Sequence, residues 1–294
     1  MRSINYALLK FLSRFSSSAK IKLRKNIALN TPLTINYPAE AELKIIKSII
    51  PPEKPFFDVG ANYGIYSYIA KDIVDLKNIY CFEPITKPYT ALQKNLRGAN
   101  LFNLALSNEV SIKTIKVPYI NGDCYDTRAT LETGIENENE THSNKIEIQT
   151  STLDTIVEKS NISSIGFIKI DVEGHEFNVI KGGLTSIRKF KPILQLEIEQ
   201  RQNSQPIENI FKLVLDLGYS GHYINVSDLT LIPIITFSKE SNQKMSDFKT
   251  HKFINNFLFF PTQTEQTIIN KISKQLNIEK SLVKVKNHAL RTWL

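Results

Sequence analysis

The sequence predicts an α/β fold, in which helices flank one open and mostly parallel sheet. Two stretches carry this prediction. Residues 55–70 read as a short apolar strand, a turn bracketed by glycines and then a helix. Residues 165–176 read as a buried strand that runs directly into a cluster of ionisable residues. Strand and helix patterns alternate along the rest of the chain, which is typical of this fold class.

The composition indicates one large folded domain with additions at both ends. The chain has 294 residues, of which 41% are hydrophobic, so it is long and apolar enough to bury a core. Its two cysteines form neither a disulfide framework nor a metal-binding pattern. We therefore expect a reducing compartment and a cytoplasmic protein.

The net charge of +8 is concentrated at the two ends of the chain. Residues 1–39 contribute +7 and residues 263–294 contribute +4, which leaves −3 for the body between them. A mildly acidic body argues against a nucleic-acid partner. Basic ends fit contact with an anionic surface better.

The first segment has the pattern of a basic amphipathic helix. Its apolar side chains at helical spacing are Ile4, Leu8, Phe11, Leu12 and Phe15. Three interpretations stay open, namely peripheral membrane contact through residues 1–25, an organellar transit peptide and a terminal helix packed on the body. No stretch approaches the roughly 18 apolar residues that span a bilayer.

The elements of the first half follow from periodicity and from prolines. We expect a helix at residues 39–50, because apolar residues recur at helical spacing and two prolines end it. After the first strand we expect a strand, a helix and a third strand at residues 77–83, 88–96 and 100–106.

Residues 110–152 interrupt the alternation of strands and helices. Two segments of alternating polarity, residues 111–117 and 145–150, are predicted to pair as β arms. The polar stretch between them includes the acidic residues 132–142. We expect this stretch to be a mobile loop, and a substrate lid is the sharper alternative.

The alternation resumes after residue 152 and defines the domain boundaries. We expect helices at residues 153–160, 177–188 and 207–217, and strands at residues 165–170, 192–199, 219–226 and 256–261. The chain then divides into a basic helical region at residues 1–50, the main domain at residues 51–262 and a helical tail at residues 263–294.

The turn after the first strand predicts a nucleotide-type ligand site. Asp58, Gly60, Asn62 and Gly64 give the spacing DxGxNxG. The glycines let the backbone approach a ligand, and the helix start offers unpaired NH groups. A pyrophosphate site would instead need GxGxxG, and an acid at position 58 would repel phosphate. The spacing favours a cationic ligand that carries an amino-acid part, and S-adenosylmethionine fits this description.

Two further residues are expected beside the same turn. Glu83 ends the second strand, where a carboxylate can accept hydrogen bonds from ribose hydroxyls. Ala105 belongs to residues 104–107, which we expect to flank the base. At the end of the strand at residues 165–170, ionisable residues gather where open parallel sheets place their chemistry. They are Asp171, Glu173, His175 and Glu176.

A resemblance to a known family follows from seven segments taken in order: DVGANYGIYS, CFEP, NLALSN, TLDT, FIKIDVEGHE, PILQLEIE and NFLFFP. Together they resemble the FkbM-type methyltransferases, which are S-adenosylmethionine-dependent enzymes of the seven-stranded Rossmann-like class. The resemblance runs from residue 55 to residue 261. It implies a strand order of 3-2-1-4-5-7-6 with strand 7 antiparallel, and methyl transfer to a hydroxyl that is often on a sugar or a polyketide.

This chemistry assigns roles to the ionisable cluster. A hydroxyl acceptor loses its proton as it attacks, so a general base assists the reaction. We expect Asp171 to orient the cofactor or the acceptor, and His175 or Glu173 to take the proton. A Mg²⁺ site on these residues is disfavoured, because alternate residues leaving a strand do not converge easily on one ion, and no metal is expected.

The acceptor and two other classes of protein stay open at this point. We expect a hydroxyl-bearing acceptor, a glycan or glycolipid, and a small secondary metabolite is the alternative. A nicotinamide-dependent oxidoreductase would share the sheet but would need the pyrophosphate glycines. A non-catalytic membrane-associated scaffold would fit the basic ends, yet it would not need acids at two strand ends.

Overall fold

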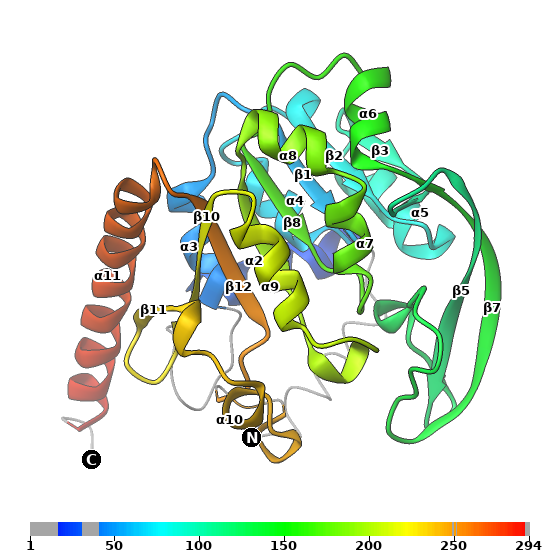
Figure 1. Cartoon of the computed structure of the whole chain (residues 1–294). Coiled ribbons are helices and arrows are strands. Elements are labelled where there is room, and N and C mark those ends of the chain that lie inside the picture. Colours follow the sequence, from blue (N-terminus) through cyan, green and yellow to red (C-terminus); the bar gives the residue numbers. More distant parts are fainter. Residues whose placement is uncertain (1–16, 31–40, 249, 251, 292–294) are drawn as a thin grey trace.

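An eight-stranded sheet forms the centre of the molecule, as Figure 1 shows. The description rests on a computed structural model and covers residues 17–30, 41–248, 250 and 252–291. The helix expected at residues 4–15 lies outside these ranges. The strands of the sheet are β1 (Phe56–Val59), β2 (Ile79–Phe82), β3 (Asn100–Phe102), β8 (Phe167–Ile170), β9 (Ile193–Glu197), β10 (Tyr219–Asn225), β11 (Thr230–Pro233) and β12 (Asn256–Pro261).

The order of the strands is β11-β10-β12-β9-β8-β1-β2-β3. The neighbours from β9 to β3 all pair in parallel. By contrast, β12 is antiparallel to β9 and also to β10. The expected order 3-2-1-4-5-7-6 with an antiparallel strand 7 is thereby confirmed. One edge strand was not expected, because β11 is short and ends in a proline.

Helices cover both faces of this sheet (Figure 1). One face carries α3 (Ala41–Ile49), α4 (Ile65–Ala70) and α5 (Thr86–Asn95), and the other carries α6 (Leu153–Lys159), α7 (Glu176–Lys181), α8 (Leu184–Phe190) and α9 (Glu208–Leu215). Successive side chains of a strand point to opposite faces. Phe56 of β1 accordingly packs into the first core and Phe57 into the second.

The helix expected at residues 177–188 is broken into α7 and α8 at Gly182 and Gly183. The break has a packing reason, because a Cβ on Gly182 would lie 2.0 Å from the carbonyl oxygen of Ser107. The new helix start is then stabilised by Asp154, whose carboxylate accepts hydrogen bonds from the backbone NH groups of residues 185 and 186 at 3.1 and 2.8 Å.

The third expected strand, residues 100–106, divides between two sheets. Its first part is β3, and its second part, β4 (Ala105–Leu106), pairs in parallel with β7 (Glu140–Ser151) of a smaller sheet. That sheet has the order β4-β7-β5-β6, with β5 (Ser111–Ile120) and β6 (Asp123–Cys124). The expected antiparallel pairing of the two β arms is confirmed, and both arms are longer than expected.

The polar stretch between the arms, which we expect to be a mobile loop, contacts the main domain near its start. Residues 140–142 belong to β7. The hydroxyl of Thr130 donates a hydrogen bond to the backbone oxygen of Glu173 at 2.6 Å. Glu132 contacts His175 through its carboxylate at 2.7 Å. Thr130 and Glu132 thus join the small sheet to the loop that follows β8.

Helices from both ends of the chain pack on the first face of the sheet. Helix α2 (Ser17–Asn30) contacts α4 and α5, and α11 (Glu265–Arg291) contacts α3. Lys44 of α3 and Glu279 of α11 form a buried ion pair at 2.8 Å. A further short helix, α10 (Lys239–Asn242), precedes β12. Among the helices that the structure describes, none is both long and apolar enough to cross a bilayer.

Candidate active site

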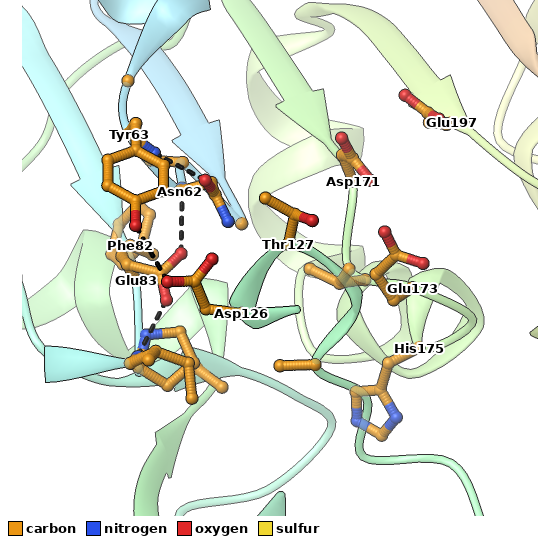
Figure 2. Close-up of a pocket in the computed structure, with 18 of the residues that line it drawn as sticks. Asn62, Tyr63, Phe82, Glu83, Asp126, Thr127, Asp171, Glu173, His175 and Glu197 are labelled. Atoms are coloured by element: carbon orange, nitrogen blue, oxygen red, sulfur yellow. Dashed lines mark hydrogen bonds between the residues drawn. The ribbon is translucent and has the colours of Figure 1, made fainter. Parts of the chain in front are cut away.

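A cleft opens at the carboxyl ends of β1, β2 and β8, where the small sheet faces the main one. It encloses about 990 Å³, including its mouth. Figure 2 shows Glu83 and Asp126 on one side of this cleft and Asp171 and Glu173 on the other. The cleft therefore has two polar sides with different carboxylates.

The glycine turn is shaped by close approach between strand ends. Gly60 has a φ of 74°, and a Cβ on it would lie 1.8 Å from the carbonyl oxygen of Asp171. The NH groups of Gly60 and Ala61 both donate to the carbonyl of Phe82 at 3.0 Å. Only glycine fits this position, and the turn locks the ends of β1, β2 and β8 together. Gly64 has a φ of 83°, and a Cβ on it would lie 2.5 Å from a side-chain methyl group of Leu92.

Glu83 stands where the sequence placed it, at the end of β2 and in the lining of the cleft. Its carboxylate accepts hydrogen bonds from the backbone NH groups of Asn62 and Ile85, each at 2.8 Å. Asn62 adopts a left-handed conformation with a φ of 49°. Burial raises the pKa of Glu83 to about 7, and the two backbone donors oppose this shift. The turn and the acid thus hold each other in place (Figure 2).

Asp58 is placed differently from our expectation, because it is not among the residues that line the cleft. Its side chain points from β1 toward α4 and is 2% exposed. The carboxylate accepts hydrogen bonds from the NH and the hydroxyl of Ser67 at 3.1 and 2.6 Å. Burial raises the pKa of Asp58 to about 6. The acid supports the helix behind the turn and does not line the cleft.

One polar group in the cleft was missed by the sequence analysis. The hydroxyl of Tyr63 donates to the carboxylate of Asp126 at 2.8 Å, and Lys87 lies 3.2 Å from the same oxygen. Burial, together with Asp126, raises the pKa of Tyr63 to about 12, so the phenol keeps its proton. Asp126 lies just after β6 of the small sheet. No local sequence pattern predicts its contact with Tyr63.

An apolar wall lies beside Glu83 in the cleft. Ala105 lines it, as expected, together with Leu106 of the same short strand. Ile85, Ile115 and Phe82 complete this wall. A planar base fits between such side chains, and the adjacent Glu83 supplies hydrogen-bond acceptors for a ribose.

A buried lysine lies between the carboxylates on the other side of the cleft. Lys169, in β8, is 1% exposed and lies 3.7 Å from Asp171 and 3.6 Å from Glu197. The side chains of Asp171 and Glu197 are 33% and 27% exposed. Glu197 ends β9, and the sequence analysis did not single it out. One buried positive charge thus stabilises two carboxylates that face the cleft.

Glu173 has a left-handed backbone conformation, which is unusual for a residue other than glycine. Its φ is 53°, and non-glycine residues held in this region are often found at functional sites. Its carboxylate accepts a hydrogen bond from the amide of Gln202. Burial and then the charge of Asp171 raise the pKa of Glu173 well above its usual range.

His175 is 4% exposed and has both ring nitrogens engaged. Its Nε2 is hydrogen-bonded to the hydroxyl of Ser107 at 2.9 Å, and its Nδ1 donates to Glu132 at 2.7 Å. In Figure 2 the imidazole and the carboxylate of Asp171 point in opposite directions. His175 therefore connects the small sheet to the loop after β8.

Glu176, the last member of the ionisable cluster, has a structural position. It is fully buried, and one carboxylate oxygen accepts hydrogen bonds from the NH groups of Val172 and Gly174 at 3.3 and 3.1 Å. Burial raises its pKa to about 7. The side chain holds the loop that presents Glu173. Among the described residues, no group of three or more acidic, His or Cys side chains is arranged to hold a metal ion.

The cleft fits S-adenosylmethionine on its own features. There is no room for a Cβ at Gly60, so the cleft is lined there by the backbone of the turn. The carboxylate of Glu83 is fixed by two backbone donors and faces the cleft beside the apolar wall. These features suit the ribose and the base of a nucleoside.

Comparisons with known proteins identify the family. A family model described as "Methyltransferase FkbM domain" matches residues 58–220, which is more than half of the chain. No curated protein matches the sequence with significance. Among solved structures, the methyltransferase FkbM from Methylobacillus flagellatus KT is 16% identical, with a TM-score of 0.45, and the match covers 75% of this chain and 47% of that one. This chain thus spans about half the length of that protein.

Two other solved structures have similar scores. The O-methyltransferase from Bacillus cereus in complex with SAH is 11% identical, with a TM-score of 0.41 and coverage of 86% of this chain and 96% of that one. An rRNA methylase from Streptococcus thermophilus is 10% identical, with a TM-score of 0.38 and coverage of 77% and 96%. The assignment rests on the family model and on the strand order. The chain belongs to the FkbM family of S-adenosylmethionine-dependent methyltransferases.

Proposed function

We propose that the protein methylates a hydroxyl group on a sugar, as part of a glycan or a glycolipid. The proposal depends on the polar groups that line the side of the cleft opposite Glu83. Asp171 and Glu197 present partly exposed carboxylates there, and Lys169 lies buried between them. Carboxylates accept hydrogen bonds from neighbouring hydroxyls, as a sugar offers them. A negative charge at the reacting end of an acceptor would be repelled.

The residues on the other side account for cofactor binding. Glu83 would accept hydrogen bonds from the ribose, and the backbone of the turn at residues 60–64 would contact the amino-acid part. Ala105, Leu106 and Ile85 would enclose the base. When bound, S-adenosylmethionine supplies a methyl group that is already activated by its cationic sulfur. The protein's main task is then to orient the acceptor oxygen and to accept its proton.

We assign the role of general base to Glu173. Its raised pKa makes it a stronger base than an ordinary carboxylate once it is ionised. It also lines the cleft next to Asp171. His175 is the weaker candidate, because an acceptor would have to displace Ser107 or Glu132 from its ring nitrogens. Asp171 then orients the acceptor.

Methyl transfer to defined acceptors tests this proposal. The purified protein is incubated with S-adenosylmethionine carrying a labelled methyl group and with glycolipid and glycan extracts, and the products are analysed by mass spectrometry. We expect a gain of one methyl group on a sugar hydroxyl. Asp171→Asn should abolish most of the turnover while SAH binding, measured by calorimetry, persists. Transfer to an amine or a carboxyl group, with none to sugars, would contradict the proposal.

A further inference from the structure

A second hollow lies beside the cleft, between α2, the start of α4 and α5. It encloses about 1370 Å³, including its open side. The residues that line it are Ile21 and Arg24 of α2, Tyr63, Ile65, and Lys87, Thr90, Ala91 and Lys94 of α5. Arg24, Tyr63 and Ile65 also line the cleft. We call this hollow the α2–α5 groove, and it is continuous with the cleft.

The two helices present matching faces to the groove. On α5 the lining positions are 87, 90, 91 and 94, which share one face of a helix. On α2 they are 21 and 24, one turn apart. The hydroxyl of Ser18 donates to Asn95 at 2.7 Å, and Lys25 pairs with Asp72 at 2.7 Å. These contacts attach α2 to the rest of the domain, so the groove has two fixed walls.

The groove combines an apolar floor with a basic rim. Ile21, Ile65 and Ala91 are buried at 4%, 8% and 6% exposure. Arg24 and Lys94 are exposed above them, together with Lys87. No acidic residue is found among the described residues that line the groove. The opposite side of the cleft, with Asp171, has the reverse charge.

Lys87 marks the boundary between the groove and the cleft. Its ammonium lies 3.2 Å from Asp126, which also accepts the hydrogen bond from Tyr63. Its charge is thus partly balanced by an acid of the cleft. The rest of the rim is positively charged through Arg24, which also lines the cleft, and through Lys94.

We propose that the α2–α5 groove binds a phosphate-bearing amphiphile, with its hydrocarbon chain on the apolar floor and its phosphate at Arg24 and Lys94. Guanidinium and ammonium groups are the side chains that bind phosphate best, and the floor gives a chain apolar surface to bury. The proposal deepens the proposed function and rests on it. The acceptor sugar is then linked through a phosphate to a hydrocarbon chain, which the groove holds while the sugar enters the cleft.

Direct binding to the full chain tests the groove without any methyl transfer. The probe is decyl phosphate below its micelle concentration, titrated by calorimetry, with decyl maltoside and inorganic phosphate as comparisons. We expect decyl phosphate to bind at least about tenfold more tightly than either, because only it uses both the rim and the floor. Its affinity should fall as salt is raised, since exposed charges are screened. Equal affinity for either comparison compound overturns the proposal.

Matched pairs of variants in and just after α5 locate the binding site. Thr90→Glu places a carboxylate among the basic residues and should weaken decyl phosphate binding by about tenfold. Gln93→Glu makes the same charge change at an exposed position of α5 outside the groove, and it should have little effect. Lys94→Gln should weaken binding by about threefold, whereas Arg97→Gln beyond the helix should not. Equal effects within each pair would overturn the site.

The result can be separated from the outcome for the proposed function. SAH binding is measured on the same proteins and shows that the cleft is intact. If sugars are methylated but decyl phosphate does not bind, only the groove proposal fails. If decyl phosphate binds at the groove while no sugar hydroxyl is methylated, the proposed function fails and the groove remains a binding site.

Discussion

Replacement of Glu83 by glutamine separates cofactor binding from the stability of the turn. The carboxylate is 4% exposed and accepts one hydrogen bond from Asn62 and one from Ile85 through different oxygens. In Glu83→Gln the introduced amide keeps one acceptor, while its NH₂ group faces a backbone donor. One NH group therefore loses its partner, and the group that faces the ribose loses its charge.

The size of the effect follows from these contacts. Hydrogen bonds to a charged group are worth about 1.5–3 kcal/mol. We therefore expect SAH to bind roughly ten- to a hundredfold more weakly to Glu83→Gln. Leaving a buried NH group without a partner costs about 1–3 kcal/mol of folding stability.

Glu176→Gln is the matched control for this experiment. Glu176 is also buried, also accepts two backbone hydrogen bonds and also has a pKa raised to about 7, but it does not line the cleft. In Glu176→Gln one amide oxygen can accept both hydrogen bonds, so only Glu83→Gln should leave a backbone donor unpaired, and only Glu83→Gln should lose SAH affinity in calorimetry. If Glu83→Gln binds SAH within a factor of about two of the unaltered protein, the assignment of Glu83 to the ribose is refuted.

The pH dependence of stability gives a second readout on the same residue. Burial raises the pKa of Glu83 from 4.5 to about 7, so the folded protein holds this proton more tightly than the unfolded chain does. Stability is therefore lost as the pH rises from about 4.5 to about 7 and then stays level. Between pH 5 and pH 8 this loss amounts to roughly 2–3 kcal/mol. Urea unfolding of Glu83→Gln should show a correspondingly smaller fall over that range.

Three further predictions follow from other parts of the molecule. Gly60→Ala should cost more than about 3 kcal/mol in urea unfolding, because its Cβ would lie 1.8 Å from a backbone oxygen; Gly122→Ala, at a similar positive φ with nothing within 4 Å, should cost only about 1 kcal/mol, and equal losses would contradict the packing argument. Glu173→Gln should lower kcat by about 10²–10⁴-fold and remove the rise of rate with pH that its deprotonation produces, so a retained rise in the pH–rate profile would assign the proton to another group. Lys44→Met should cost about 3–5 kcal/mol because it leaves the carboxylate of Glu279 buried and unpaired, and Lys44→Met/Glu279→Leu should recover most of that loss; no recovery in the double variant would mean that the ion pair itself is needed.

Most of the sheet could be predicted from the sequence because its signals are local. Short apolar runs such as residues 165–170 are bounded by turn residues, and their order along the chain matched a recognisable series of motifs. The predictions failed where packing overrides local pattern. Gly182 breaks a helix because another backbone approaches it, and Ala105 leaves the main sheet because β7 pairs with it.

The candidate site was predictable to the extent that its residues follow strand ends. Gly60, Glu83 and Asp171 each come directly after a parallel strand, so they meet at one edge of the sheet. The pattern predicted that Asp58 is important, but it did not predict the direction in which its side chain points. Its place inside β1 directs the side chain toward α4, where Ser67 accommodates it.

The sequence by itself determined the glycine turn and the acids at the strand ends, since each depends on residues close together in the chain, whereas the strand order was expected only from the resemblance to a known family. Only the tertiary structure brought Asp126 to Tyr63, Glu132 to His175 and α2 to α5. These contacts join segments that are far apart in the chain, such as Tyr63 and Asp126, which are 63 residues apart. Which such segments meet is decided by how the small sheet and the terminal helices bury their apolar faces, and no local pattern of residues encodes that choice.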